Sequence, residues 1–573
     1  MATEQVLIIG GGALGPKVAC RLKRLRPDWE VTVVEQQEEI ACSICGIPYY
    51  ISGDVAEIKG LMTASFQMVR SREFFENAKD VRIRTKTRAI ALDRQSKQVR
   101  VRHMETGAEE TLSYDKLVLA TGRRPRPLDA PGCDLPGVIS ATTLRQAEDV
   151  KQRLSKGDVA RAVIVGAGPR GLEMTAAVSD LWGVETAVVE SGPQVLPDLV
   201  DLPVARMVQQ EVQSRGVQVF LNESVREILT SSGEHSLEVV TSNQRLPADL
   251  VIIALGAEPR TELGLSAGLV VSPSGGLIVN QRLQTSDPAI YAGGGCIENF
   301  HLLTGKATYF FEPSLAHRQG RVIGTNLSGG CVTFPGVIGS FTLKVFDLAV
   351  AGAGLTLGAA RREGLAAEAA LVVQQDHAHF YPTQELIYLQ LVVDRNSKRL
   401  LGAQGVSPNG DALVGRINSI AALLLHRGSI EDLANLEVAY SPPYATALDI
   451  VNTVANTAEN IITGFNQSIS VAEFQHLFLE EAEDDVICLD VRGAANAAPF
   501  VALFKERWLN IPQETLKHRF DEIPRDKRLI LICNAGMRSY EALRQLQTRG
   551  FDNAVGLQGG VAALKKAGIL NVG

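Results

Sequence analysis

The chain has 573 residues, 45% hydrophobic and 21% charged, and this length and composition indicate a globular protein of about four domains. Its formal net charge of −7 argues against a global basic field that would recruit nucleic acid or an anionic membrane surface. The longest apolar stretches, such as residues 420–425, fall far short of the roughly 20 residues that a membrane span requires. Eight cysteines without a disulfide framework and an N-terminus without a signal sequence favour a reducing compartment, so we expect a cytoplasmic protein.

The N-terminal segment has the pattern of a nucleotide-binding βαβ unit. Apolar runs at 6–9 and 31–34 predict two strands, with an amphipathic helix between them and an acid, Glu35, after the second strand. Glycines between strand and helix permit a tight turn and close approach of a pyrophosphate, and the acid can bind a ribose diol. The sequence therefore predicts a dinucleotide site that contains Gly10, Gly12, Gly15 and Glu35.

The same helix carries a basic stripe. Lys17, Arg21 and Arg24 follow one another at spacings of four and three, which places them on one side of a helix. The stripe is either a solvated helix surface or a set of phosphate contacts.

A candidate reactive thiol follows in the run Cys45-Gly-Ile-Pro-Tyr49. Glycine and proline predict a turn that opens a helix, and amides at a helix N-terminus stabilise a thiolate. The alternative is a buried cysteine that acts as a small hydrophobic residue. Cys42 forms a C-x-x-C pair with Cys45, so it is either a resolving thiol or a residue that fills space in the loop.

A second βαβ unit begins at residue 162 and ends at Glu190. A carboxylate at Glu190, followed by Ser191 rather than by a base, would repel a 2′-phosphate, which favours NADH over NADPH. Further strands at 117–120 and 251–255 end in small-residue turns, and a glycine-rich turn closes the run 285–295. The positions that these patterns single out are Gly166, Gly168, Gly171, Thr121, Gly122, Gly256 and Gly295.

Together these motifs resemble the flavoprotein disulfide reductases with two dinucleotide folds, over about residues 1–460. The resemblance implies that the first site binds FAD and that the second, inserted in the FAD domain, binds the nicotinamide cofactor. It places Thr121, Gly122 and Gly256 at the return crossings. Gly295 stands where the family has an aspartate that contacts the flavin ribitol, so we expect weakened FAD binding. Glu173 matches an acid near the nicotinamide, although a surface glutamate is equally consistent.

The Cys45 run resembles the single-cysteine branch of coenzyme A disulfide reductases, NADH oxidases and NADH peroxidases. The resemblance implies that Cys45 is the redox-active thiol and that the basic stripe binds the nucleotide end of coenzyme A. It also implies a homodimer in which Tyr381 and Tyr440 reach the partner subunit's thiol. A phenol there can donate a proton to a leaving thiolate. The alternative for each tyrosine is a buried interface position.

The C-terminal region restarts the α/β pattern. Cys533 follows the apolar strand 528–532 and opens the run Cys533-Asn-Ala-Gly-Met-Arg538-Ser539 before a helix. Amides curling around a thiol at a helix N-terminus form an anion nest. With Asp490-Val-Arg and Gly559-Gly560, the region resembles a single rhodanese domain, which implies sulfur transfer at Cys533 with Arg538. Arsenate or phosphate chemistry and an inactive module are the alternatives. Residues 493–508 lack the family's usual glycine-rich run.

The expected fold is α/β, with two Rossmann-like dinucleotide-binding domains, an α+β dimerisation domain and an α/β rhodanese domain. The expected function is reduction of persulfides or polysulfides, such as coenzyme A persulfide, by an NADH-linked FAD enzyme. One alternative is a coenzyme A disulfide reductase or NADH oxidase with an accessory rhodanese. Another is a sulfurtransferase whose flavin half senses redox state. No metal site, nucleic acid or membrane partner is expected. The expected domains are an FAD domain at 1–155 and 266–330, an NAD(H) domain at 156–265, a dimerisation domain at 331–460 and a rhodanese domain at 468–573.

Overall fold

The computed structural model describes residues 3–231, 235–481 and 485–570. The chain divides into two compact units. The first unit contains residues 1–166, 174–188 and 224–337, and the second contains 167–173, 189–223 and 338–573. No helix within the described ranges is both long and apolar enough to cross a membrane.

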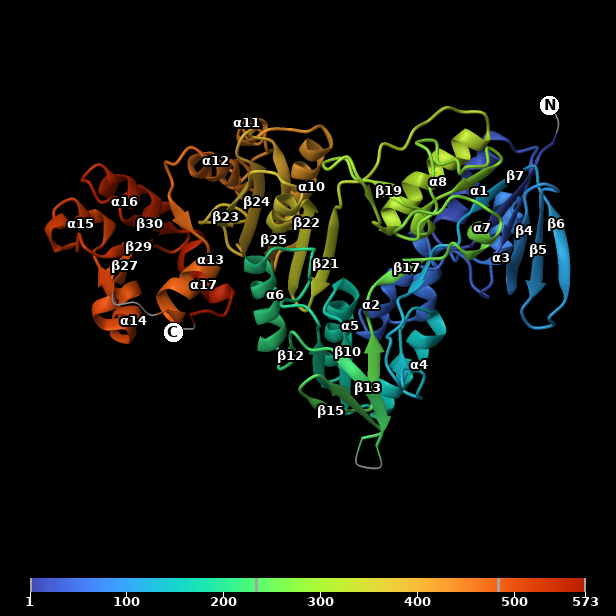
Figure 1. The fold of residues 1–573 in the computed structure, drawn as a ribbon, viewed down its shortest axis with the longest axis horizontal. Coiled ribbons are helices and arrows are strands. Elements are labelled where there is room, and N and C mark those ends of the chain that lie inside the picture. Colours follow the sequence, from blue (N-terminus) through green and yellow to red (C-terminus); the bar gives the residue numbers. More distant parts are fainter. Residues whose placement is uncertain (1–2, 232–234, 482–484, 571–573) are drawn as a thin grey trace. The chain divides into compact units, whose positions relative to one another are not determined.

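The first unit is built around a five-stranded parallel sheet in the order β18-β7-β1-β2-β3. Its strand β7 is labelled in Figure 1. Residues 6–9 of the central strand are buried, as expected for a parallel strand covered on both faces. Helices α1 (Leu14–Leu25) and α8 (Pro313–Leu327) pack against each other beside this sheet. The strands are β1 (Gln5–Ile9), β2 (Glu30–Val34), β3 (Arg82–Arg84), β7 (Lys116–Leu119) and β18 (Ile290–Ala292).

This unit also contains smaller antiparallel sheets and strands of the second βαβ unit. Strands β4 (Thr87–Asp93), β5 (Gln98–His103) and β6 (Glu109–Ser113) form an antiparallel sheet. The second βαβ unit places its strands in the order β11-β10-β16-β9, and its helix is α5 (Pro169–Ser179). Those strands are β9 (Val138–Ile139), β10 (Arg161–Val165), β11 (Glu185–Val189) and β16 (Leu250–Ile253).

The second unit contains an antiparallel sheet in the order β21-β22-β25-β24-β23. β25 is buried along its whole length, because α10 (Gly410–Leu425) and α6 (Leu202–Ser214) both pack against it. Helix α12 (Ile450–Ile462) covers β23 and β24. The strands are β21 (Phe341–Val345), β22 (Leu348–Gly354), β23 (Ala367–Gln375), β24 (Leu386–Asp394) and β25 (Leu400–Ser407).

A half-buried carboxylate anchors residues 189–223 to this sheet. Asp201 precedes α6 and accepts hydrogen bonds from the backbone of Leu357 at 2.8 Å and from Gln390 Nε2 at 2.7 Å, and Gln404 Nε2 donates to the same oxygen. Gln390 is only 3% exposed, so its amide requires such a partner. The polar side chain of Gln390 on a buried strand is therefore explained by its contact with Asp201, which is distant in the sequence.

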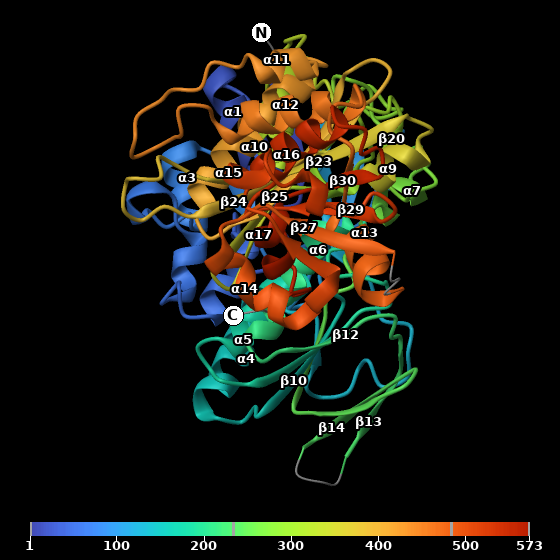
Figure 2. The same cartoon turned by 90° about the vertical axis from the view of Figure 1, so that its left-hand side faces the viewer.

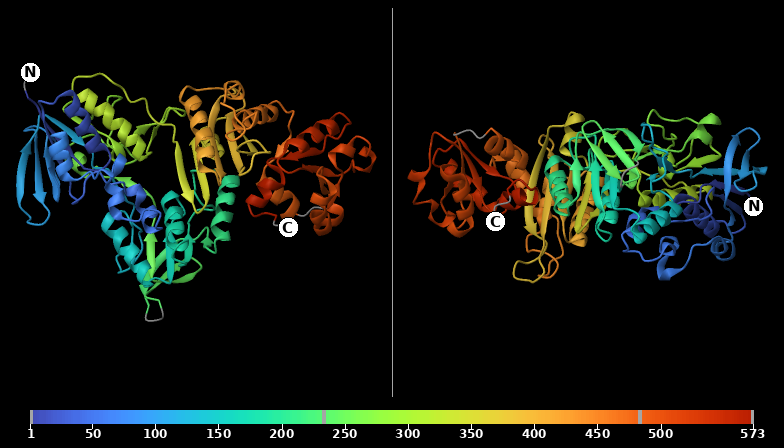
Figure 3. Two further views of the ribbon diagram at one scale, coloured as in Figure 1. Left: turned by 180° about the vertical axis from the view of Figure 1, so that it is seen from behind. Right: turned by 90° about the horizontal axis from the view of Figure 1, so that it is seen from below.

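The C-terminal module of the second unit is a parallel sheet in the order β26-β30-β29-β27-β28. Figure 2 looks onto this module, with α16 (Met537–Gln547) and α17 (Gly560–Lys566) beside the strands. In both views of Figure 3 the module, in red, lies next to the sheet that ends at β23. The strands are β26 (Ser468–Ile469), β27 (Val486–Asp490), β28 (Trp508–Asn510), β29 (Arg528–Ile532) and β30 (Ala554–Leu557).

A buried ion pair organises the centre of this module. Asp490 and Arg492 are 0% and 4% exposed and form a two-pronged contact, with Arg492 Nη2 at 2.6 Å from Asp490 Oδ2. Trp508 Nε1 donates to the same carboxylate at 3.1 Å. Removal of one partner from a buried pair leaves an uncompensated charge.

We therefore expect Asp490→Ala to destabilise the C-terminal module by about 3–5 kcal/mol. Calorimetric unfolding of the full chain, with hydrogen exchange of β27 and β29, measures this effect. Glu522→Ala is the control, because it removes an ion pair with Arg519 that is largely exposed. Equal, small shifts in both variants would show that the buried pair does not support the module.

Candidate active site

The first glycine-rich turn lies at the carboxyl end of β1. Gly10 has a φ of +118°, and a Cβ there would lie 2.1 Å from the Ala120 carbonyl oxygen, so only glycine fits. A Cβ on Gly15 would lie 2.0 Å from the Gly10 carbonyl oxygen. A Cβ on Gly12, in contrast, would meet no atom within 4 Å. The turn thus leaves open space at Gly12, where a pyrophosphate would approach the backbone.

Glu35 holds this turn in place. Its Oε2 accepts a hydrogen bond from the Gly11 amide at 2.6 Å, and its Oε1 accepts one from the Gln37 amide at 2.9 Å. A carboxylate has about four acceptor positions, so Glu35 can bind a ribose diol while it holds the turn. The site fits a dinucleotide such as FAD.

The neighbouring strand ends complete this edge of the sheet. Thr121 Oγ1 donates to the Arg260 carbonyl oxygen at 2.6 Å, and Gly122 has a φ of +70°. Beyond β18, a Cβ on Gly295 would lie 3.2 Å from Phe311 and 3.3 Å from Arg123. From the sequence, Gly295 was expected only to lack the carboxylate that contacts the flavin ribitol. The structure adds that Phe311 and the stacked Arg123 guanidinium, 4.1 Å from the ring centroid, occupy the adjacent space.

Cys45 lies in an exposed turn of the first unit. The turn passes from η1 (Ile44–Gly46) into the short helix α2 (Ile47–Ile51). A Cβ on Gly46 would lie 2.4 Å from Leu61, which explains why glycine follows the thiol. Arg70 Nη2 donates to Ser43 Oγ at 3.3 Å and ties the turn to residues 58–70.

Cys42 has a different environment. It is half-buried, and burial, together with the charges of Glu39 and Glu35, raises the pKa of its thiol to about 12. Its Sγ lies 3.7 Å from the Ile40 carbonyl oxygen. The Cys42 thiol is therefore protonated at neutral pH, whereas thiolates are the nucleophiles in thiol exchange.

The basic stripe of α1 lies against α8. Cβ atoms on Gly320 and Gly324 would lie 3.0 Å from Lys17 Cβ and 2.8 Å from Arg21 Cβ, so these glycines make room for both basic stems. Arg21 Nε donates to Thr325 Oγ1 at 3.1 Å. Arg24 is exposed at the last turn of α1.

Sequence reasoning missed the basic residues of α8. Burial, then the neighbouring guanidinium groups of Arg321 and Arg24, lower the pKa of Arg21. Burial, Lys17 and Arg70 likewise lower the pKa of His317. Several cations this close together create a positive potential that attracts an anion. The sequence did contain an indication of these residues, because the basic positions 318 and 321 are three apart and so lie on one side of α8.

The second glycine-rich turn repeats the geometry of the first. A Cβ on Gly166 would lie 2.7 Å from the Ala254 carbonyl oxygen, and one on Gly168 would meet no atom within 4 Å. Glu190 is buried; its Oε2 accepts from the Ala167 amide at 2.8 Å and its Oε1 from the Gly192 amide at 2.8 Å. Glu173 and Gly256, which the sequence also indicated, are not among these donors to Glu190.

Those positions are a helix glutamate and a strand-end glycine. Glu173 lies 4.0 Å from Arg170 on α5, and Gly256 has a φ of +83°. Gly171 follows Arg170 on the same helix, where residues 171 and 172 are buried.

Two tyrosine-bearing loops meet at one end of the antiparallel sheet in the second unit. Tyr381 and Tyr440 are 38% and 52% exposed within the chain. The Ala378 amide donates to the Pro442 carbonyl oxygen at 3.2 Å, which joins the two loops. Arg416 Nη2 donates to the Asp376 carbonyl oxygen at 2.8 Å and to the Tyr444 carbonyl oxygen at 3.3 Å, so it also spans both loops.

Cys533 lies at the carboxyl end of β29 and is 2% exposed. The Gly536 amide donates to its Sγ at 3.1 Å, and Ser539 Oγ lies 3.5 Å from it. Gly536 adopts a φ of +103°, which turns the loop around the sulfur. Arg538 is half-buried on the first turn of α16. This sulfur-holding loop (residues 533–539) can stabilise a sulfur anion with the Gly536 amide, while the Ser539 hydroxyl donates to the Gly536 carbonyl oxygen at 2.9 Å.

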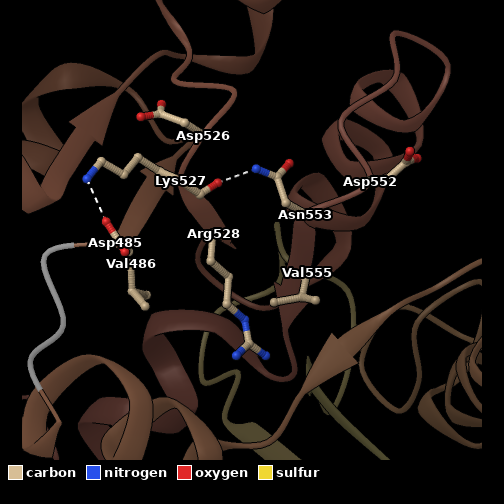
Figure 4. Close-up of a pocket in the computed structure, with 8 residues that line it drawn as sticks. All are labelled: Asp485, Val486, Asp526, Lys527, Arg528, Asp552, Asn553 and Val555. Carbon is tan, nitrogen blue, oxygen red and sulfur yellow. Dashed lines mark hydrogen bonds and ion pairs between the residues drawn. The ribbon is translucent and has the colours of Figure 1, made fainter.

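A cavity of about 500 Å³ lies at the opposite edge of the same sheet. Figure 4 shows its lining at the amino ends of β27, β29 and β30, including the Lys527–Asp485 ion pair of 2.9 Å. Cys533 follows the carboxyl end of β29. The cavity is therefore separate from the thiol site.

Two glycine-turn dinucleotide sites, an exposed thiol and a sulfur-holding loop define a class of redox enzymes that use a nicotinamide cofactor. A family model described as pyridine nucleotide-disulphide oxidoreductase matches residues 4–318, and the dimerisation domain of that family matches residues 340–450. A rhodanese-like domain matches residues 479–567. The chain belongs to the pyridine nucleotide-disulphide oxidoreductase family.

Known relatives resemble most of the chain. A protein of Pyrococcus furiosus named NAD(P)H sulfur oxidoreductase (CoA-dependent) is 33% identical over 450 residues, covering 78% of this chain and 98% of the relative. The structure of an NAD-dependent persulfide reductase from A. fulgidus has a TM-score of 0.91 and 36% identity, over 98% of this chain and 99% of that chain. The reduced Bacillus anthracis CoADR-RHD has a TM-score of 0.89 and 28% identity, over 99% and 98%.

These findings confirm the predicted fold class and the resemblance on which it was based. The chain is an oxidoreductase of a family that uses FAD and a nicotinamide cofactor. FAD would be held by the turn at Gly12 and by Glu35, and it would supply two-electron transfer.

We expect Cys45 to react with iodoacetamide at pH 8 much faster than Cys42. Cys45 is exposed, whereas the raised pKa of Cys42 keeps it a thiol until strongly alkaline pH. Peptide mapping after short labelling of the full chain measures both rates. Similar labelling of the two cysteines would contradict the assignment of distinct environments.

Proposed function

We propose that the protein reduces persulfides with NADH, and that coenzyme A persulfide is its substrate. The observation that carries the proposal is the joint presence of an exposed thiol at Cys45 and a sulfur-holding loop at Cys533 in one oxidoreductase chain. The sulfur and persulfide substrates in the names of the two relatives from Pyrococcus furiosus and A. fulgidus support it.

The proposed reaction balances without a further reactant. The Cys45 thiolate attacks the outer sulfur of R–S–SH, the substrate's S–S bond breaks, and R–S⁻ leaves. The Cys45 persulfide then takes up a hydride equivalent from NADH and returns to thiolate as hydrogen sulfide is released. The sum is R–S–SH + NADH → R–S⁻ + hydrogen sulfide + NAD⁺, and one proton taken up from solvent converts R–S⁻ to R–SH. Glu190 favours NADH, because its carboxylate would repel a 2′-phosphate.

The remaining site residues have proposed roles in this reaction. The dimerisation domain indicates self-association, and we propose a homodimer in which Tyr381 or Tyr440 protonates the leaving thiolate at the partner's Cys45. Both phenols are partly exposed within one chain and thus available to a second copy. Glu173 would lie near the nicotinamide, and Arg538 would help to hold sulfur at Cys533.

Coenzyme A is the proposed carrier because its phosphates fit the cations of α1. The glycines of α8 let Lys17 and Arg21 lie close to that helix. Burial and the nearby charges of Arg321 and Arg24 lower the pKa of Arg21, and a bound polyanion would oppose the effect of those charges. The outer sulfur would be loaded on Cys533, moved to coenzyme A and reduced at Cys45.

Stopped-flow mixing tests the proposal. With NADH, coenzyme A persulfide should be consumed with stoichiometric release of hydrogen sulfide, and Cys45→Ser should lose at least a thousandfold of this turnover, because its hydroxyl is a far poorer nucleophile. Cys42→Ser is the matched control and should retain most of it.

Two outcomes would replace the proposal with another function. Faster NADH oxidation with coenzyme A disulfide or air than with the persulfide would identify a disulfide reductase or an oxidase. Binding of NADH without turnover on any of these substrates would identify a sulfurtransferase with a redox-sensing flavin half.

We also expect Arg21→Glu/Arg24→Glu to raise KM for coenzyme A persulfide by roughly 10–100-fold, because a hydrogen bond to a charged group contributes about 1.5–3 kcal/mol. KM for a small persulfide such as that of cysteine should stay nearly constant. Lys97→Glu/Arg145→Glu, on exposed positions of the same unit, is the charge-matched control. Parallel changes on both substrates would exclude a coenzyme A subsite at α1.

A further inference from the structure

A side-chain amide of the C-terminal module pairs with an edge strand of the antiparallel sheet. Gln558 Nε2 donates to the Ala369 carbonyl oxygen at 3.4 Å, and its Oε1 accepts from the Leu371 amide at 2.9 Å. β23 is at the end of its sheet, and its other side pairs with β24. In parallel pairing, one residue bonds the carbonyl and the amide that flank its opposite residue. Gln558 therefore takes the place of a parallel strand opposite Ala370.

The amide is held from its own module as well. Gln558 Nε2 also donates to Ser468 Oγ at 3.1 Å, and its backbone amide donates to the Ile469 carbonyl oxygen at 3.0 Å. The next residue, Gly559, has a φ of +70°, and a Cβ there would lie 3.2 Å from Val373. A Cβ at this position would also lie 2.7 Å from Ala563 Cβ, so glycine serves the packing of the module itself as well as its contact with β23.

The same segment supports the sulfur-holding loop. A Cβ on Gly560 would lie 2.3 Å from the Cys533 carbonyl oxygen, so the loop backbone rests directly on this glycine. The Val561 amide donates to the Cys533 carbonyl oxygen at 2.9 Å, and the Ala562 amide donates to that of Asn534 at 2.9 Å. Residues 558–562 therefore contact β23 on one side and the Cys533 loop on the other.

β23 continues from this contact to the loop that bears Tyr381. The strand ends at Gln375, and the next residue, Asp376, is 1% exposed and accepts from Asn409 Nδ2 at 2.7 Å. The adjacent His377 ring lies edge-on to the Tyr381 ring, with centroids 5.5 Å apart. Leu371 and Asp376 are about 17 Å apart along an extended strand. One strand thus carries both the docked Cys533 loop and the Tyr381 loop.

Two charged contacts reinforce the docking. Lys566 Nζ lies 3.0 Å from Glu211 Oε2, and Arg206 Nη1 donates to Gln475 Oε1. Both join the C-terminal module to α6 within the second unit. The C-terminal module is therefore held to the rest of the second unit by several contacts, in addition to the chain connection.

We propose that Gln558 is a positioning residue that docks the Cys533 loop on β23 and thereby sets the place from which sulfur is handed to a carrier thiol. This inference rests on the proposed function. The step is Cys533–S–SH + R–S⁻ → Cys533–S⁻ + R–S–SH. The carrier thiolate attacks the outer sulfur, the S–S bond at Cys533 breaks, and no net oxidation or reduction occurs. The carrier persulfide is then the substrate at Cys45.

The test compares three activities of the full-length holoenzyme. Gln558→Ala should keep transfer of sulfur from thiosulfate to cyanide, which uses Cys533 alone, within about twofold. It should equally keep NADH-dependent reduction of ready-made coenzyme A persulfide. Coupled NADH oxidation with thiosulfate and coenzyme A should fall about tenfold, because the loop is no longer fixed. Gln545→Ala, an exposed glutamine of α16, is the matched control, and Cys533→Ser sets the floor of the coupled assay.

Hydrogen exchange tests the contact between Gln558 and β23 independently of enzymatic turnover. The Leu371 amide should exchange faster in Gln558→Ala and remain slow in Gln545→Ala. Unchanged exchange at Leu371 would overturn the docking contact, whether or not the enzyme reduces persulfides. Faster exchange with unchanged coupled turnover would overturn the positioning role, and so would an equal loss in the thiosulfate–cyanide assay. Failure of the wild-type protein to reduce coenzyme A persulfide would refute the proposed function instead, and with it the hand-over step.

Discussion

The structure depends on one repeated interaction, in which an acid at the end of a second strand binds the backbone of a preceding glycine turn. Glu35 accepts from Gly11, and Glu190 accepts from Ala167, each on the residue after the first glycine. The bond fixes the turn at the carboxyl edge of its sheet, where amides and a helix N-terminus meet an anion. Because each carboxylate has further acceptor positions, a single residue can shape the turn and bind a ribose.

The basic surface of α1 and α8 and the Cys533 loop can both bind anions, but with different donors. Along α1 and α8, closely packed cations lower the pKa of Arg21. Around Cys533 the donor to the sulfur is the backbone amide of Gly536, which carries no net charge. A cationic surface attracts a phosphate-rich carrier over a distance, whereas neutral donors stabilise a sulfur anion at short range. The two kinds of site are thus suited to a carrier and to its cargo.

The features that sequence predicted are those whose physical cause is local. The glycine turns, their acids and the Cys533 loop each lie within a short segment, so spacing alone indicated them. Distant contacts were not visible in this way. Gln390 is a polar residue on a buried strand, and only its contact with Asp201 explains it. Gln558 follows β30, and only its contact with β23 explains it. The crowding at Gly295 likewise comes from Phe311, which lies on another segment.

The cysteines of this chain have thiols in different environments. Burial raises the pKa of Cys296 and raises that of Cys488 well above its usual value, and in both cases the thiol is completely enclosed. Cys42 is raised to about 12 although it lies three residues from Cys45. An unsupported thiolate is costly in such places, and the Cys296 thiol instead donates to the carbonyl oxygens of Leu119 at 3.4 Å and Gly293 at 3.3 Å. Cys533 is also buried, but an amide points at its sulfur. The Cys296 sulfur donates to carbonyl oxygens whereas the Cys533 sulfur accepts from an amide, so the buried thiols of this chain differ in the polar groups that face them.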